Sequence, residues 1–113
     1  MPGVSIHVVD VSRGVVAAGM RVELYRGAAC LASGEIGADG LLEHVALKER
    51  FAPDNYQAVF HVAEYYRKAG VPIPPRPFLQ VVRYDFGIDQ PEQHYHLPFK
   101  CTPWGYSCFR GGA

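Results

Sequence analysis

Three kinds of segment are missing from this sequence, and each absence excludes a class of protein. No apolar run approaches the roughly 18 residues that a membrane-spanning helix needs. Lys and Arg are scattered singly and the net charge is zero, so we expect neither a nucleic acid nor an anionic membrane as partner. Residues 1–5 have no charged start followed by an apolar stretch, so we expect no secretory signal.

Cysteine is also scarce. Cys30, Cys101 and Cys108 cannot all pair within one chain, and none of them stands in a CxxC pattern. Free thiols are typical of reducing compartments. We therefore expect reduced cysteines in a soluble cytoplasmic protein, with Cys108 buried and inert.

The residues that are present predict one all-β domain over 1–113. Apolar residues make up 49% of the chain, enough for a single core. Gly, Pro, Asp and Asn punctuate short runs rich in Val, Ile, Leu, Phe and Tyr, which is typical of a sandwich or barrel. The predicted strands are 5–10, 20–26, 29–34, 41–45, 55–62, 78–86, 93–100 and 105–110. One helix is predicted over 63–69, ended by Gly70.

Two strands combine apolar and chemically active residues in strict alternation. In 93–101 the large or apolar positions are Tyr95, Leu97, Phe99 and Cys101, and the alternate positions include His94, His96 and Lys100. In 5–10, Ile6 and Val8 are typical core residues, so His7 faces the other way. Because strand side chains alternate between faces, the sequence predicts histidines and a lysine on an outer face of the sandwich.

Six blocks of this sequence, in order, are similar to those of one known family. They are IHVVD at 6–10, ADG at 38–40, YQAVFHV at 56–62, PFL at 77–79, HYHLP at 94–98 and TPWGYS at 102–107. The chain resembles the transthyretin-like 5-hydroxyisourate hydrolase family over roughly residues 5–112. The resemblance implies an eight-stranded β-sandwich with one short helix, assembled as a homotetramer (a dimer of dimers) with active sites in a channel between the dimers. It further implies a small cyclic amide substrate and no metal or organic cofactor.

The resemblance also implies a set of site residues, which this chain matches only in part. His7 and His96 match the two family histidines, and Arg110 and Gly111 match the middle of a C-terminal Tyr-Arg-Gly-Ser motif. Leu41 stands where the family has Arg, Phe109 where it has Tyr, and Gly112 where it has Ser. We therefore expect a catalytic set, His7, His96 and Arg110, and a substrate-binding set, Leu41, Lys100, Ser107, Phe109 and Gly111.

Amide hydrolysis explains why these residue types are wanted. A base must activate water, and positive or hydrogen-bonding groups must meet the oxygen that becomes negative. A histidine suits the first task and a cation the second. Leu41 stands where the family has its Arg, so this chain lacks that cation. Lys100, four residues after His96 on the same strand face, is the candidate replacement.

Several simpler interpretations compete with this one. His7 and His96 could be ordinary surface histidines, or could bind zinc together with His94. Lys100 could be a solvated strand-end lysine. His44, His61 and His94 are expected to be peripheral, and Trp104 and Tyr106 to be core or interface aromatics. At the level of function, the alternatives are a diverged enzyme of a specialised biosynthetic pathway that uses the same channel on another small ring, and a non-catalytic small-molecule binder like transthyretin.

Overall fold

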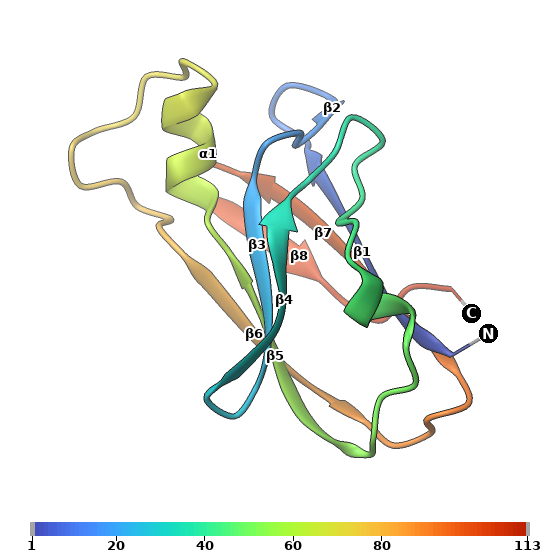
Figure 1. Cartoon of the computed structure of the whole chain (residues 1–113). Helices are drawn as coiled ribbons and strands as arrows, with labels where there is room; N and C mark the ends of the chain where they lie inside the picture. Colours follow the sequence, from blue (N-terminus) through green and yellow to red (C-terminus); the bar gives the residue numbers. More distant parts are fainter. Residues whose placement is uncertain (1, 113) are drawn as a thin grey trace.

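The computed structural model describes residues 2–112 as two four-stranded β-sheets, one short α-helix and one 3₁₀ helix (Figure 1). The sheet orders are β2-β1-β7-β8 and β4-β3-β5-β6. The strands are β1 Gly3–Asp10, β2 Val15–Val16, β3 Arg21–Arg26, β4 Ala29–Glu35, β5 Asp54–Phe60, β6 Val82–Ile88, β7 His94–Thr102 and β8 Gly105–Cys108; the helices are η1 Val45–Lys48 and α1 Val62–Lys68. The predicted eight-stranded sandwich with one short α-helix is confirmed.

The two central strands of the first sheet, β1 and β7, are parallel, whereas the other strand pairs of residues 2–112 are antiparallel. Ser5 pairs with His96, His7 with Pro98, and Val9 with Lys100. The start of the chain and its last fifth are thereby held side by side, at the same end of the sandwich (Figure 1).

The core lies between the two sheets and follows the predicted alternation. In β7, Tyr95, Leu97, Phe99 and Cys101 are buried, and in β1 Ile6 and Val8 are fully buried. The rings of Phe60 in β5 and Phe99 in β7 stack across the sheets at 3.8 Å between centroids. Burial of aromatic and aliphatic side chains of this size is the main stabilising contribution to such a fold. The alternate side chains of β1 and β7, which include His7 and His96, therefore face away from the core.

A buried carboxylate joins the first sheet to α1. Asp10 is 0% exposed and accepts five hydrogen bonds, from Ser12 N and Oγ, Arg13 Nε, and the hydroxyls of Tyr65 and Tyr66. Burial alone would raise the pKa of Asp10, but these hydrogen bonds outweigh it and hold the pKa below its ordinary value. The carboxylate therefore stays ionised and fixes the helix against the end of β1.

The segment after β4 corrects one strand prediction. Leu41 makes an isolated bridge to His7, and Leu42 N donates to Ile6 O, but the predicted strand 41–45 goes no further. His44 accepts the Ala46 amide at Nδ1 and so caps η1, which turns the chain away from the sheet. The eighth strand is instead β2, whose two residues pair with Val9 and Asp10.

Other boundaries also moved. The strand predicted over 78–86 begins only at Val82 and ends at Ile88. Phe78 is 82% exposed, and Gln80 O accepts from Ala63 N in α1 rather than from a strand. The last strand, predicted to end at Arg110, ends at Cys108. The α-helix was correctly placed, and Gly70 follows it with φ of +79°, the left-handed conformation that favours glycine.

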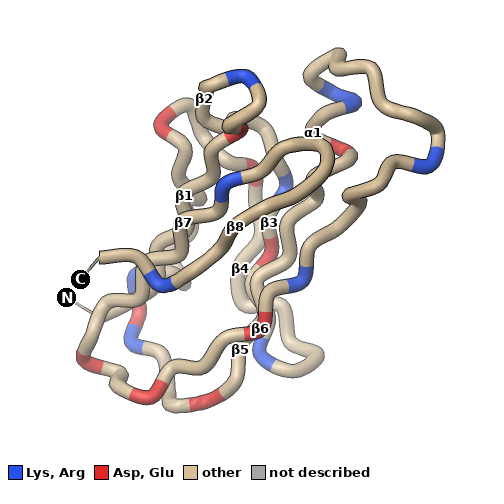
Figure 2. Tube along the Cα trace, turned by 180° about the vertical axis from the view of Figure 1, so that it is seen from behind, with Lys and Arg blue, Asp and Glu red and all other residues tan. Residues whose placement is uncertain are grey.

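Charges of both signs are spread over the trace without a block of either sign (Figure 2). Within residues 2–112, no helix has the length and apolar character required to cross a membrane. The three cysteines are free; Cys30 is exposed, Cys101 is buried, and Cys108, expected to be buried, is half-buried. Burial raises the pKa of the Cys101 and Cys108 thiols to about 11, so both remain protonated.

Candidate active site

The outer face of the β2-β1-β7-β8 sheet carries most of the candidate residues, in three adjacent rows. The register of β7 with β8 continues beyond Cys108, because Gly111 N donates to His96 O at 2.7 Å. The first row is Ser5, His96 and Gly111; the second is Leu41, His7, Pro98 and Phe109; the third is Val9, Lys100 and Ser107. The structure therefore brings His7, His96 and all five of the predicted binding residues onto one face.

Ser5 connects two histidines in and beside the first row. Its Oγ lies 2.6 Å from His96 Nδ1 and 2.8 Å from His94 Nε2, and His94 Nδ1 lies 3.4 Å from the Pro2 carbonyl oxygen. The three side chains are half-buried. His96 is thus held through its Nδ1, and its Nε2 is left for other partners.

The surroundings of His96 favour the uncharged imidazole. Burial lowers its pKa below the ordinary histidine value, and the nearby His7 and His94 lower it further, because a positive charge on either would repel an imidazolium. A neutral imidazole has a lone pair that can accept a proton. His96 is therefore suited to act as a base near neutral pH.

His7 is packed against a turn. Gly40 is buried and has φ of +84°, and a Cβ at this position would lie 2.5 Å from His7 Nε2. The backbone on either side is tied to β1, since Val8 N donates to Gly40 O and Leu42 N donates to Ile6 O. Leu41 pairs with His7, so an apolar side chain flanks this histidine where the resemblance implies an Arg.

Lys100 occupies the third row and is exposed. Four residues of strand separate it from His96, about 13 Å between Cα atoms. Its Nζ lies 5.8 Å from the centre of the Phe109 ring, a cation–π distance, and Phe109 belongs to the second row with His7. The ammonium group therefore leans toward the histidines, while Ser107 lies directly beside Lys100 on β8.

Arg110 is not part of this face. It follows the alternation of Tyr106 and Cys108 on the core side of β8, and its guanidinium lies 4.0 Å from the centre of the Tyr95 ring. Its Nη2 donates to Gln93 Oε1 at 2.9 Å and to His94 O at 3.3 Å. In the single chain Arg110 thus holds the backbone before His96, and its guanidinium lies on the opposite side of the sheet from His7 and His96.

An apolar groove of about 440 Å³ borders the first row. Its apolar lining includes Val4, Leu41, Leu42 and Leu47, and its polar lining is Ser5, Glu43, His44, Lys48 and His94. A groove of this size can hold a small ring or an apolar substituent. The groove thus adds a non-polar wall to the side of the site on which Leu41 lies.

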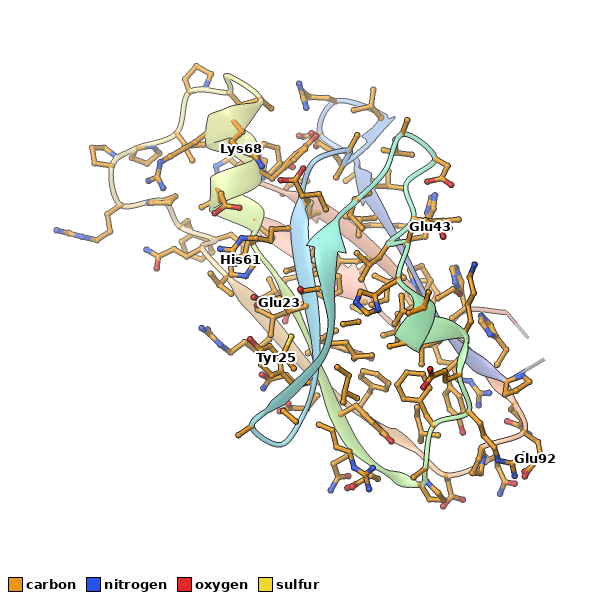
Figure 3. All side chains as sticks on the ribbon, viewed as in Figure 1. Glu23, Tyr25, Glu43, His61, Lys68 and Glu92 are labelled. Atoms are coloured by element: carbon orange, nitrogen blue, oxygen red, sulfur yellow. The ribbon has the colours of Figure 1, made fainter. Side chains whose placement is uncertain are left out.

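The two remaining histidines lie off the outer face of β1 and β7, although His44 also lines the groove. His44 caps η1, and His61 lies beside Glu23 on the other sheet near the start of α1, with Nε2 3.1 Å from Glu23 Oε1 (Figure 3). Arg21 Nη2 lies 3.3 Å from His61 Nδ1. Over residues 2–112, no group of three or more His, Cys, Asp or Glu side chains is arranged to hold a metal ion. Trp104 and Tyr106, expected to be core or interface aromatics, are 71% and 50% exposed.

The model of the HIUase/Transthyretin family matches residues 4–111, nearly the whole chain. The chain belongs to this family. It is 37% identical over 110 residues to 5-hydroxyisourate hydrolase 2 of Rhizobium meliloti (strain 1021), covering 93% of this chain and 92% of that protein. It is 38% identical over 124 residues to the 5-hydroxyisourate hydrolase of Deinococcus radiodurans, covering 97% and 96%.

Two solved structures of the HIUase/Transthyretin type extend the comparison. The structure of Klebsiella pneumoniae 5-hydroxyisourate hydrolase superposes with a TM-score of 0.82 and 29% identity, covering 99% of this chain and all of that one. A crystal structure of (S)-allantoin synthase superposes with a TM-score of 0.89 and 34% identity. The chain covers 43% of that synthase, and the match takes in 97% of this chain. The family resemblance noted from sequence blocks is confirmed.

Sequence reasoning missed two residues that contact the candidate histidines, Ser5 and Gly40. Ser5 stands two positions before His7, so strand alternation places it on the same face, a signal that was present but not used. The packing of Gly40 against His7 carried no such signal, because it depends on how the turn after β4 folds back onto β1.

Proposed function

We propose that this protein hydrolyses a C–N bond of a small cyclic amide, of the kind that its relatives' names indicate, on the outer face of β1 and β7. In this proposal His96 removes a proton from water, and the hydroxide attacks the carbonyl carbon. The C–N bond of the tetrahedral intermediate then breaks, and the protonated imidazole returns the proton to the leaving nitrogen. His7 orients the water and the ring beside it.

The observation that carries the proposal is that a neutral, hydrogen-bonded His96 lies on the same face as His7, one row away. Lys100, leaning toward the second row, provides positive charge for the oxyanion. Arg110 acts in this proposal as a positioning residue through the His94 carbonyl rather than as a direct catalytic contact.

We further propose that a second copy of the chain covers this face, as in a dimer of dimers. His7 and His96 are only half-buried and Lys100 is exposed, whereas hydrolysis benefits from exclusion of bulk water. Trp104, in the turn before β8, and Phe109, just after β8, add exposed aromatic surface. Light scattering at micromolar concentration is expected to give the mass of a tetramer, and a monomer mass would contradict this part of the proposal.

The direct test uses freshly generated 5-hydroxyisourate, whose ultraviolet absorbance decays on ring opening. Wild-type protein is expected to accelerate the decay, and His7→Ala and His96→Ala to lower the rate by about 100-fold or more. His61→Ala is the matched control, because His61 lies on the other sheet beside Glu23. Equal losses in all three variants would attribute the effect to stability and remove the catalytic assignment.

Leu41 favours a second candidate, a diverged enzyme of a specialised biosynthetic pathway that acts on a different small ring. An apolar side chain beside His7 and the apolar groove next to it fit a substrate that is less polar than 5-hydroxyisourate. If wild type leaves 5-hydroxyisourate unchanged and Leu41→Arg accelerates its decay, the diverged function is favoured.

A further inference from the structure

A chain of hydrogen-bonding groups leads from a backbone carbonyl to His96. It runs from Pro2 O to His94 Nδ1 at 3.4 Å, from His94 Nε2 to Ser5 Oγ at 2.8 Å, and from Ser5 Oγ to His96 Nδ1 at 2.6 Å. β1 supplies Ser5 and β7 supplies both histidines, and the parallel pairing places Ser5 beside His96. The three side chains are half-buried.

The donor and the acceptor of each hydrogen bond in this chain follow from the Pro2 carbonyl at its end. A carbonyl oxygen only accepts, so His94 Nδ1 must carry the proton that it shares with Pro2 O. A neutral His94 then has its lone pair on Nε2, so the Ser5 hydroxyl must donate to it. Ser5 has a single hydrogen to give, so its oxygen must accept from His96, and His96 must carry its proton on Nδ1.

We propose that Ser5 and His94 are positioning residues that fix His96 as the Nδ1–H tautomer, with the lone pair on Nε2. The catalytic consequence rests on the proposed function, in which His96 is the base. The reverse tautomer would direct the lone pair at Ser5 and offer the substrate an N–H instead. If the tautomer is fixed before the substrate binds, every protein molecule has the lone pair on Nε2, where it can accept a proton.

The same hydrogen bonds can persist through both proton transfers of the proposed reaction. When His96 Nε2 takes the proton from water, the Nδ1–H bond to Ser5 remains, and it becomes a charge-assisted hydrogen bond from the imidazolium. No proton needs to move through Ser5 or His94. When Nε2 gives its proton to the leaving nitrogen, the original tautomer is restored.

Two other histidines, His44 and His61, carry the opposite tautomer and serve as internal references. Arg21 Nη2 can only donate, so His61 Nδ1 accepts from it and His61 Nε2 donates to Glu23. The Ala46 amide donates to His44 Nδ1, so His44 also carries its proton on Nε2. The structure therefore assigns Nδ1–H to His94 and His96, and Nε2–H to His44 and His61.

Nitrogen-15 NMR of the full chain, with labelled histidine and at pH 8, measures these tautomers without any substrate. The expected spectrum shows Nδ1–H for His96 and the opposite tautomer for His44 and His61. An Nε2–H form of His96 in wild type overturns the proposal. Because this measurement needs no turnover, an Nδ1–H His96 in a protein that leaves 5-hydroxyisourate unchanged would support the tautomer assignment while refuting the proposed substrate.

Variants of Ser5 test the cause. Ser5→Ala is expected to release His96 from the Nδ1–H form and to lower kcat about 100-fold with little change in KM, because the base is lost but the binding face is kept. Ser5→Thr keeps the hydroxyl and is expected to keep both tautomer and rate. Unchanged His44 and His61 signals would establish that each variant is folded. If Ser5→Ala leaves His96 as Nδ1–H, Ser5 does not set the tautomer and the proposal fails; if Ser5→Ala does not fold, the wild-type tautomer still decides.

Discussion

Substitution of Gly40 by alanine separates the strain of a turn from the position of His7. Gly40 has φ of +84°, a conformation that costs an alanine about 1–2 kcal/mol. The added methyl would also lie 2.5 Å from His7 Nε2, so the ring must move by about 1 Å to reach an ordinary contact distance near 3.5 Å. A displacement of this size at a catalytic group can cost about 100-fold in rate.

Gly19 provides the matched control. Its φ is +90°, but a Cβ at this position would meet nothing within 4 Å. Both variants carry the cost of the left-handed backbone, but a Cβ at Gly40 also meets Val16 Cγ1 at 2.9 Å, so Gly40→Ala is expected to lose more stability in urea unfolding. Only Gly40→Ala is expected to lose about 100-fold in kcat/KM. The assay is the decay of 5-hydroxyisourate, or of the native substrate once it is identified. Equal activity of the two variants would refute the reasoning that His7 acts from its present position.

Three further predictions concern charge. Lys100→Met is expected to lower kcat/KM about 100-fold, as for loss of an oxyanion donor, and wild-type kinetics would return Lys100 to the role of a solvated lysine. Because the pKa of His96 is lowered, the acid limb of a kcat/KM profile is expected below the ordinary histidine value of about 6.5, and a limb above that value would contradict His96 as the base. The folded pKa of Asp10 lies below its unfolded value, so its stabilisation is present above about pH 4 and lost as the pH falls through the folded pKa. Asp10→Asn is therefore expected to cost about 3 kcal/mol in urea unfolding at pH 7 and much less at pH 2, and equal costs at the two pH values would contradict an ionised Asp10.

Local patterns were sufficient for the faces of the strands. Period-two alternation correctly placed His7, His96 and Lys100 outward, because side chains alternate in any extended strand whatever its neighbours. The same alternation groups Arg110 with Cys108 on the core side of β8, whereas the family motif assigned Arg110 to the catalytic set.

Tertiary pairing decided what local patterns could not. The strand predicted over 41–45 is apolar enough to extend, but His44 caps a 3₁₀ helix and the pairing with β1 stops after Leu42. The bridge from Ser5 to His94 and His96 depends on parallel pairing between distant strands, which nothing in either segment specifies alone. Most element types were therefore predictable, but the strand over 41–45 and β2 were not, nor were the contacts among the candidate site residues.

The parallel pairing of β1 with β7 has a consequence for how the protein is made. Ser5 and His96 are 91 residues apart in the chain, and Gly111 lies beyond both. A nascent chain on the ribosome exposes β1 long before β7 emerges, so the first strand must wait for its partner, and contacts of such large separation form slowly. The outer face that carries His7 and His96 therefore forms only after β7 has been synthesised, and a chain terminated before β7 carries His7 but not His96.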